Sequence, residues 1–261
     1  MDTLAADSFA TVVSERAGEV CTAEAMRVRD AYEALHDDFA SWTPSASFAA
    51  AFERGVIAEI RRRLAARHDR PMRILEVGCG HGVWAGRIRG AFAGAGDRLE
   101  YTGIDLSIRR VTLARERLAD WRTANFTVAD GEAFVPVAPV DLLLAIEIIS
   151  HVPAARQGAW LDRWRDWLAP GGCAVIIDKD KYSRHALKVW WDRTRRHWLP
   201  IGLRGKPYFP AHFTPLMDTL RYPSFRRLAR LARRAGLPAR PVQTEGAFHI
   251  LTMDRLDHSG I

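Results

Sequence analysis

Five short apolar runs alternate with stretches of helical spacing between residues 70 and 180, and this alternation constrains the fold most strongly. The apolar runs are Ile74–Val77, Tyr101–Asp105, Phe126–Asp130, Asp141–Ile146 and Cys173–Asp178. Helical spacing fills the intervals, as over Val111–Trp121 and Ala155–Leu168. Strands that alternate with helices form a parallel sheet covered by helices on both faces. We therefore expect an α/β, doubly wound fold.

The end of the chain predicts an addition to the edge of this sheet. Val242–Thr244 and Phe248–Met253 read as two strands joined by a turn at Glu245-Gly246, which is typical of an antiparallel hairpin. Before them, Ser224–Ala235 has helical spacing, with Ser224 as the expected N-cap and Gly236 as the stop.

A glycine-rich loop, Glu76-Val-Gly78-Cys-Gly80-His-Gly82, follows the first strand and opens a helix. Glycine lets the backbone turn sharply and approach a ligand closely, because no Cβ stands in the way. Ligands of open α/β sheets bind at the carboxyl ends of the strands, where this loop is expected. Gly80–Ala85 also fits the GxGxxA pattern of dinucleotide-binding enzymes, so an NAD(P)-linked oxidoreductase remains an alternative.

Three further features favour a different ligand. Asp105 ends the second strand, where a carboxylate can accept hydrogen bonds from ribose hydroxyls, and Asp130 ends the third strand before Gly131-Glu132. Leu168–Gly172 forms a Pro-Gly-Gly turn before the fifth strand. Together with the glycine loop, this set resembles the class I S-adenosylmethionine-dependent methyltransferases over residues 70–180 and 224–254.

The resemblance implies a seven-stranded sheet in the order 3-2-1-4-5-7-6 with strand seven antiparallel. It also implies that S-adenosylmethionine is the cofactor, with S-adenosylhomocysteine as its product. Asp105 would hold the ribose hydroxyls, Asp130 would accept from the adenine amino group, and Glu76 would order the loop. The residues expected at the cofactor are Glu76, Gly78, Cys79, Gly80, Gly82, Asp105, Leu106, Asp130, Gly131, Glu132, Glu147 and Tyr32.

A candidate general base follows the fourth strand. Glu147-Ile-Ile-Ser-His151-Val-Pro resembles the Glu-x-x-Glu-His-Val-Pro stretch of ubiquinone-type O-methyltransferases. A hydroxyl acceptor must lose its proton, and a neutral imidazole with a pKa of about 6.5 suits that task. Alternatively, His151 caps or packs the following turn. Ser150 replaces the second Glu, so we expect no metal site at Glu147 and His151.

The N-terminal region has helical spacing over Asp30–Phe39 and Phe48–Ala66. Tyr32 lies in a stretch that resembles the helix which small-molecule methyltransferases fold over the donor, although a core aromatic would give the same pattern. Trp42 and Phe48 are candidates for the same lid. His81 lies in the glycine loop and Trp84 follows it, and both are expected to shape the pocket.

The positive charge is concentrated in one segment. The chain has 34 Arg and 4 Lys and a net charge of +7, but residues 181–240 alone carry +13 and the rest sums to −6. This excludes a protein that binds nucleic acid over its whole surface. Within the segment, the Arg face of the helix 224–235 is expected to be solvated.

The remaining part of the segment, 181–223, is expected to form a lid over a small-molecule or lipid-like, possibly anionic acceptor. Its candidate acceptor contacts are Tyr182, His185, Trp190, Trp191 and Trp198. An anionic membrane surface also suits interleaved Arg and Trp. Single-stranded nucleic acid, and with it an RNA methyltransferase, is a weaker alternative because no RNA-binding module or Asn/Asp-Pro-Pro-Tyr motif is present.

These observations predict three parts: a helical cap over 1–70, a methyltransferase core over 71–180 and 224–261, and the lid over 181–223. Cys21, Cys79 and Cys173 are far apart, and no basic-apolar leader precedes residue 20, which favours the cytoplasm. The membrane alternative would add a peripheral position at the inner membrane surface. A non-catalytic donor-binding protein that docks on membranes is a further alternative.

Overall fold

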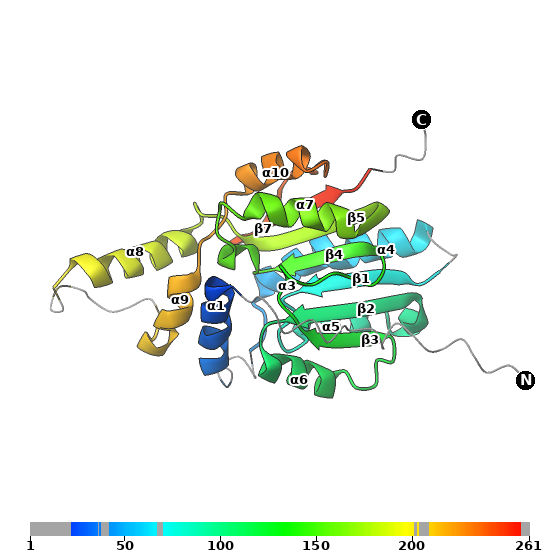
Figure 1. The fold of residues 1–261 in the computed structure, drawn as a ribbon, viewed down its shortest axis with the longest axis horizontal. Coiled ribbons are helices and arrows are strands. Elements are labelled where there is room, and N and C mark those ends of the chain that lie inside the picture. Colours follow the sequence, from blue (N-terminus) through cyan, green and yellow to red (C-terminus); the bar gives the residue numbers. More distant parts are fainter. Residues whose placement is uncertain are drawn as a thin grey trace, which may run out of the picture.

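A computed structural model describes residues 22–35, 37, 42–66, 70–200, 203 and 209–256. Its centre is a seven-stranded sheet in the order β3-β2-β1-β4-β5-β7-β6 (Figure 1). β7 runs antiparallel to β5 and β6, and the other neighbouring pairs are parallel. This confirms the predicted topology. The strands are β1 Met72–Val77, β2 Leu99–Asp105, β3 Ala124–Val128, β4 Val140–Ile146, β5 Leu168–Lys179, β6 Gln243–Glu245 and β7 Phe248–Asp254.

Helices cover both faces of the sheet, as the alternation predicts. The helices are α1 Ala23–Ala34, α3 Ala46–Phe52, α4 Ala58–Ala66, α5 Val83–Ala91, α6 Ile108–Arg117, α7 Gln157–Trp167, α8 Arg184–Trp198, α9 Thr214–Thr219 and α10 Phe225–Arg234. A π-helical turn over Glu53–Ile57 joins α3 to α4. One apolar core lies between the sheet and α3, α4, α5 and α6, and a second lies between the sheet and α7 and α10.

Several strand boundaries differ from the sequence prediction. β3 ends at Val128, so Asp130 lies in the loop that follows the strand. The predicted turn Leu168–Gly172 forms the irregular start of β5, where the register against β4 shifts between Val140 and Leu142. Glycine is needed there because a Cβ on Gly172 would lie 2.8 Å from the carbonyl oxygen of Ala169.

The N-terminal helices have two different positions. α3 and α4 pack against the sheet, and Phe48 is buried there with its ring stacked on Phe248 at 4.0 Å. Its prediction as a lid residue is therefore wrong, since the apolar side chain covers the sheet. α1 instead crosses the carboxyl ends of the strands (Figure 1). It begins earlier than predicted, and residues 36, 38 and 39 of the predicted Asp30–Phe39 helix lie outside the described residues.

The insertion between β5 and α10 leaves and rejoins the core at one point. The backbone N–H of Lys181 donates to the carbonyl oxygen of Pro223 at 2.9 Å. The carboxylate of Asp180 accepts from the backbone N–H groups of Tyr182 and Phe225, each at 2.9 Å. α10 thus begins at the predicted Ser224, but the Asp180 carboxylate replaces the Ser224 side chain as its cap. From this base α8 projects away from the sheet, and α9 lies between α8 and α1 (Figure 1).

Within the described ranges, no helix has the length and hydropathy needed to cross a bilayer.

Candidate active site

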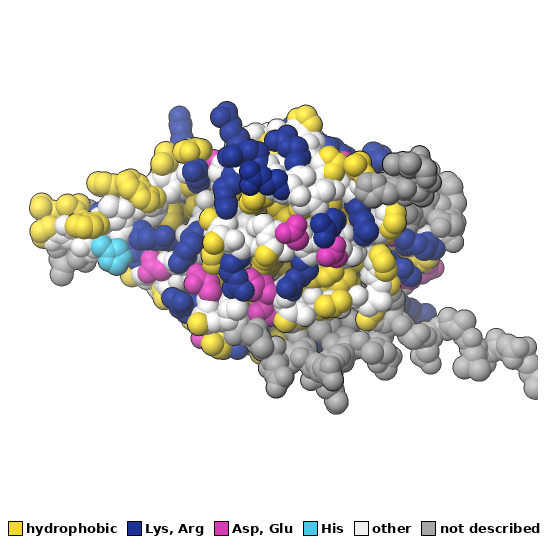
Figure 2. All heavy atoms as spheres, turned by 45° about the horizontal axis from the view of Figure 1, so that its top comes forward, with side chains coloured by type: hydrophobic (Ala, Val, Ile, Leu, Met, Phe, Trp, Pro, Cys, Tyr) yellow, Lys and Arg dark blue, Asp and Glu magenta, His cyan; other side chains and the backbone are white. Residues whose placement is uncertain are grey.

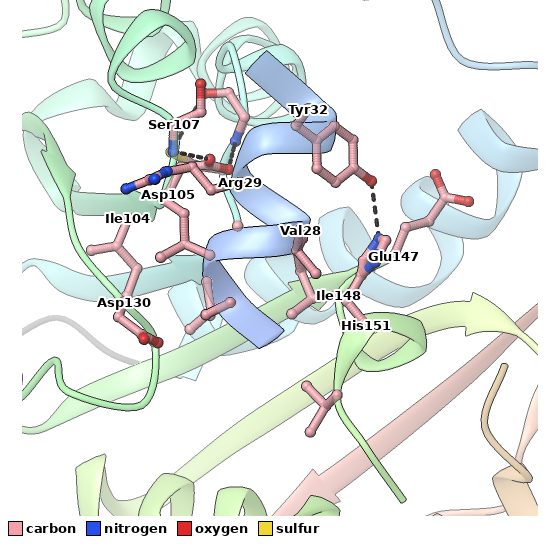
Figure 3. A pocket seen from close by; sticks show the side chains of 18 of the residues that line it. Val28, Arg29, Tyr32, Ile104, Asp105, Ser107, Asp130, Glu147, Ile148 and His151 are labelled. Carbon is pink, nitrogen blue, oxygen red and sulfur yellow. Dashed lines mark hydrogen bonds between the residues drawn. The ribbon is translucent and has the colours of Figure 1, made fainter. Parts of the chain in front are cut away.

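A cavity opens at the carboxyl ends of the parallel strands. The loops after β1, β2, β3 and β4 form its floor, and α1 forms the opposite wall (Figure 3). Parallel strands bring their carboxyl ends to one edge, so loops distant in sequence meet there. The predicted residues that line the cavity are Tyr32, Trp42, Gly78, Cys79, Gly80, His81, Trp84, Asp105, Leu106, Asp130, Gly131, Glu132, Glu147 and His151.

The glycine loop is held close to β2. The N–H groups of Gly78 and Cys79 donate to the carbonyl oxygen of Ile104 at 2.7 and 2.9 Å. Gly78 has a φ of +77°, and a Cβ there would lie 2.0 Å from the side chain of Ile148 in the β4 loop. Glycine suits this position, because the backbone is left-handed and a Cβ would force the Ile148 side chain aside.

Glu76 and Gly82 do not belong to the cavity lining formed by the described residues, in contrast to the sequence prediction. Gly82 is the N-cap of α5, with a φ of +77° and close packing against Ala114. Glu76 is fully buried beneath the loop, where its Oε2 accepts from the Tyr101 hydroxyl. Burial raises the pKa of Glu76 to about 8. Both residues therefore support the loop from within the fold.

Two carboxylates face the cavity from neighbouring loops. Asp105 accepts from the N–H of Gly80 through Oδ2 and from the N–H of Ser107 through Oδ1, each at 2.9 Å, which fixes the glycine loop to the end of β2. Asp130 accepts from the N–H of Glu132 at 2.8 Å through Oδ1. Its Oδ2 is buried without a hydrogen-bond partner among the described residues. A buried acceptor of this kind is costly unless a ligand supplies a donor.

The loop after β3 is held by α7 and the turn before it. Glu132 accepts from the indole N–H of Trp160 at 2.6 Å and pairs with Arg156. A Cβ on Gly131 would lie 2.9 Å from Val77 and 3.1 Å from Trp160, so glycine allows this close contact. Trp160 and Arg156 also line the cavity, although the sequence analysis did not single them out.

His151 lies in a 3-10 turn after β4 with both ring nitrogens hydrogen-bonded. Nδ1 lies 3.0 Å from the Thr219 hydroxyl, and Nε2 lies 3.0 Å from the Tyr32 hydroxyl (Figure 3). The Thr219 hydroxyl gives its single proton to the carbonyl oxygen of Leu216 at 2.8 Å, so it accepts from Nδ1–H. This assigns the neutral Nδ1–H tautomer to His151 and leaves the Nε2 lone pair facing Tyr32.

Burial, together with Arg110, Arg221 and Lys179, lowers the pKa of His151 to about 3. The imidazole is therefore neutral at physiological pH, but it is a weaker base than the unperturbed side chain on which the sequence prediction rested. Its turn is fixed by Asp178 at the end of β5, which accepts from the backbone N–H of Ser150 at 2.9 Å. Burial and the neighbouring Glu147 raise the pKa of Asp178 to about 7.

Glu147 lies at the cavity edge in an unusual backbone conformation, with a φ of 55°. Its N–H donates to the carbonyl oxygen of Ile177 at 2.8 Å, and its carboxylate pairs with Lys179. A non-glycine residue in the left-handed region is strained, and such strain persists where surrounding contacts hold it. Here the strained residue directs the chain from β4 into the turn that carries His151.

α1 is fastened over the cavity by three contacts with other elements. Arg110 of α6 lies over the Tyr32 ring, with its guanidinium carbon 4.1 Å from the ring centroid. Ser107 donates to Glu33 at 2.6 Å, and the Tyr32 hydroxyl contacts His151. Burial raises the pKa of Tyr32, so its phenol keeps its proton. Figure 3 shows Val28 and Arg29 on the same helix among the lining residues.

Arg29, Arg110 and Thr219 were not among the residues predicted from the sequence. Arg29 precedes Tyr32 by one helical turn, a spacing that could have indicated a shared face. Arg110 follows the N-cap Ser107 by three residues, so the helix start could have placed it near Asp105. Thr219 gave no signal, because 68 residues separate it from His151.

The five side chains predicted as acceptor contacts have other positions, because none contributes to the cavity that the described residues form. Tyr182, Trp190, Trp191 and Trp198 are exposed on the insertion. The half-buried His185 packs edge-on against Phe209 and Tyr222. Their prediction as acceptor contacts is not supported, because α8 directs its tryptophans away from the body. The insertion reaches the site through α9 instead, by way of Thr219.

One cluster away from the cavity has the composition of a metal site but a different function. Glu59, Cys173 and Asp254 lie close together, with potential ligand atoms within 4.8 Å of one another. Arg240 pairs with both carboxylates at 2.9 and 2.6 Å, and Arg63 pairs with Glu59 at 2.7 Å. These cations already compensate the negative charge, so the cluster is an ion-pair network that ties α4 to β7.

Comparison with known proteins places this arrangement in a family. The profile of a family described as "Methyltransferase domain" matches residues 49–240, which is well over half of the chain. A search of curated proteins finds no match.

Solved structures share the fold at low identity. Magnesium protoporphyrin IX methyltransferase from Synechocystis PCC 6803, with bound S-adenosylhomocysteine, is 13% identical with a TM-score of 0.60, over 88% of this chain and 99% of its own. A mycolic acid cyclopropane synthase complexed with S-adenosylhomocysteine is 16% identical with a TM-score of 0.60, over 90% and 98%. The 1,6-didemethyltoxoflavin-N1-methyltransferase of Burkholderia thailandensis is 17% identical with a TM-score of 0.59, over 92% and 93%.

The residues of the cavity fit an adenosine-containing donor. Asp105 offers carboxylate oxygens at the end of β2, and Oδ2 of Asp130, which has no hydrogen-bond partner in the described part of the chain, offers a buried acceptor for an amino group. Apolar side chains such as Ile104 and Ile148 supply walls for a purine and a thioether chain. Together with the family match, these features establish that the chain belongs to the class I S-adenosylmethionine-dependent methyltransferases, with S-adenosylmethionine as its methyl donor.

Proposed function

We propose that this enzyme transfers the methyl group to a hydroxyl oxygen of a small-molecule or lipid-like acceptor, with His151 as the general base. The observation that carries this proposal is the orientation of His151. Its Nε2 lone pair faces a phenolic hydroxyl, that of Tyr32, at 3.0 Å, and both side chains line the cavity. A position that accepts one hydroxyl can accept another of similar geometry.

The donor supplies an electrophilic methyl group when it is bound. Gly78, Asp105 and Asp130 would hold it, each from a loop of the sheet. The acceptor hydroxyl would replace the Tyr32 hydroxyl at Nε2 of His151 and pass its proton there as the new oxygen–carbon bond forms. Thr219 is a positioning residue in this scheme, because it retains the proton on Nδ1 and keeps Nε2 available.

The low pKa of His151 decides how much the base contributes. An imidazole with a pKa near 3 is too weak a base to deprotonate a free alcohol to any large extent. Much of the rate must therefore come from holding the acceptor in line with the methyl group. The proton moves as the bond to carbon forms, when the acceptor oxygen becomes strongly acidic. A neutral, buried acceptor of hydrogen bonds suits this late transfer.

The test is His151→Gln in the full chain, assayed for methyl transfer to a panel of phenols, alcohols and amines. Turnover on hydroxyl acceptors should fall by about 10²-fold or more, while affinity for S-adenosylhomocysteine stays unchanged in calorimetry. His212→Gln, an exposed histidine outside the cavity, is the matched control. Unchanged turnover in His151→Gln would remove the base, and methylation of amines alone would exclude the oxygen acceptor.

A further inference from the structure

The helix α8 exposes a stripe of large apolar side chains, which in a folded protein are usually buried or covered by a partner. Leu187 is 51% exposed, Trp190 59%, Trp191 53% and Trp198 81%. Their spacing of three, four and seven residues places them on one side of the helix with Thr194 between them. Figure 2 shows hydrophobic side chains gathered at the projecting end of the molecule that α8 forms.

The orientation of the stripe is fixed by the opposite side of α8. Ala186 and Val189 are buried against the rest of the insertion, and Arg193 donates to the carbonyl oxygens of Met217 and Leu220 at the end of α9. Ser183 caps the helix by accepting from the N–H of Ala186 at 3.1 Å. The tryptophans therefore face outward, because the side of α8 that carries Ala186, Val189 and Arg193 is the one held against the molecule.

The charges around the stripe are positive. Arg184 and Lys188 are exposed along one edge of it. The acidic residues nearby are paired, Asp192 with Arg195 at 2.8 Å and Asp218 with Arg196 at 3.2 Å. A second group of Lys and Arg lies over α10 in Figure 2, near the base of the insertion. The stripe is therefore bordered by the exposed Arg184 and Lys188, and the described acidic side chains Asp192 and Asp218 are paired with arginines.

We infer that α8 docks on an anionic lipid surface, with Leu187 and the three tryptophans in the interface and Arg184 and Lys188 at the headgroups. Tryptophan suits this depth because its ring is apolar and its N–H reaches polar groups, and exposed basic residues near a membrane attract anionic lipids. Four side chains also offer a smaller area than the roughly 800 Å² per subunit that a stable protein dimer buries. This inference does not depend on which atom the enzyme methylates.

The test is sedimentation of the full chain with vesicles of equal parts phosphatidylglycerol and phosphatidylcholine. The wild type should bind these vesicles, bind less as salt rises, and bind pure phosphatidylcholine weakly. The triple variant Trp190→Gln, Trp191→Gln, Trp198→Gln should lose about a hundredfold or more in partition coefficient. Val135→Gln with Val137→Gln, which changes exposed apolar residues elsewhere, should bind like the wild type.

Folding is checked by circular dichroism and Tm, which the triple variant should retain because its three side chains are exposed. Failure of the wild type to bind anionic vesicles, or equal binding by the triple variant, would overturn the inference. A wild type that forms a dimer in solution but binds no vesicles, together with a monomeric triple variant, would also overturn it. So would a wild type that binds single-stranded oligonucleotides instead of vesicles, if the triple variant loses that binding.

Discussion

The two sides of the cavity are built on different principles. On the donor side, Gly78, Asp105 and Asp130 sit on loops that continue directly from strands of one sheet, and backbone hydrogen bonds hold them. On the acceptor side, Tyr32 and Thr219 come from α1 and α9 and contact His151 through their side chains. One backbone hydrogen bond, from the N–H of Arg221 to the carbonyl oxygen of Ser150, also joins the segment after α9 to the His151 turn. The donor side is therefore set mainly by the backbone of the fold, whereas the acceptor side depends largely on side-chain contacts that another sequence could replace.

The largest expected effect lies on the donor side. Gly78→Ala places a Cβ 2.0 Å from Ile148 at a φ of +77°, so the glycine loop or the β4 loop must shift. Affinity for S-adenosylhomocysteine should fall by about 100-fold or more in calorimetry. Gly90→Ala in α5 has no atom within 4 Å of its new Cβ and should bind normally. Equal affinity of the two variants would contradict a donor side fixed by close backbone packing.

On the acceptor side, Thr219→Val keeps the shape of the side chain but removes the acceptor for Nδ1–H of His151. Turnover should fall by about 10- to 100-fold, because a buried donor is left unpaired and the other tautomer becomes available. Thr219→Ser should restore most of the turnover, and donor affinity should not change. A variant that loses donor affinity and turnover together would show that the two sides are not separable.

A smaller effect is expected for Tyr32→Phe, which removes the hydroxyl at Nε2 of His151 but leaves the ring beneath Arg110. If the Tyr32 hydroxyl occupies the acceptor position, the acceptor KM should fall by about fivefold, since one hydrogen bond no longer has to be exchanged. A fall in kcat at unchanged KM would indicate that Tyr32 relays the proton.

The pKa of Glu76 allows the rigid donor side to be probed through stability. Its folded pKa of about 8 lies above the ordinary value, so the folded protein holds a proton that the unfolded chain releases. Stability from this group is present at low pH and is lost as pH rises through 8. The Tm of Glu76→Gln relative to that of the wild type should rise by about 3 °C or more from pH 5 to pH 8, because only the wild type loses stability over this range. A constant difference would mean that Glu76 is ionised in the fold.

The smallest expected change is in the titration of His151. Nitrogen NMR should show a protonated Nδ1 and an unprotonated Nε2, with no titration between pH 8 and pH 5, because the pKa is about 3. In Thr219→Val, the two tautomers should both be populated. Titration near pH 6.5 in the wild type would contradict the burial of the ring.

The same contrast explains what could be read from the sequence. The donor side was predictable, since glycines and carboxylates at strand ends have a local pattern. The strands were visible as apolar runs, and their order was implied by the family resemblance. The acceptor side was not, because the Thr219–His151 contact depends on how α9 packs. The tryptophans of α8 were assigned to the cavity from composition and from the position of the insertion after the fifth strand, where small-molecule methyltransferases build an acceptor lid. A helix with arginines on several faces has no pattern that separates inside from outside.

The closure at the base of the insertion has an evolutionary consequence. Lys181 and Pro223 are joined by one backbone hydrogen bond, and the Asp180 carboxylate accepts backbone hydrogen bonds from both chain segments of the junction. A segment whose two ends coincide can be lengthened, shortened or exchanged at little entropic cost, because loop closure depends weakly on length. The enzyme thus carries a replaceable module between fixed anchors. New surfaces and new acceptor contacts could evolve there while the sheet and the donor loops stay unchanged.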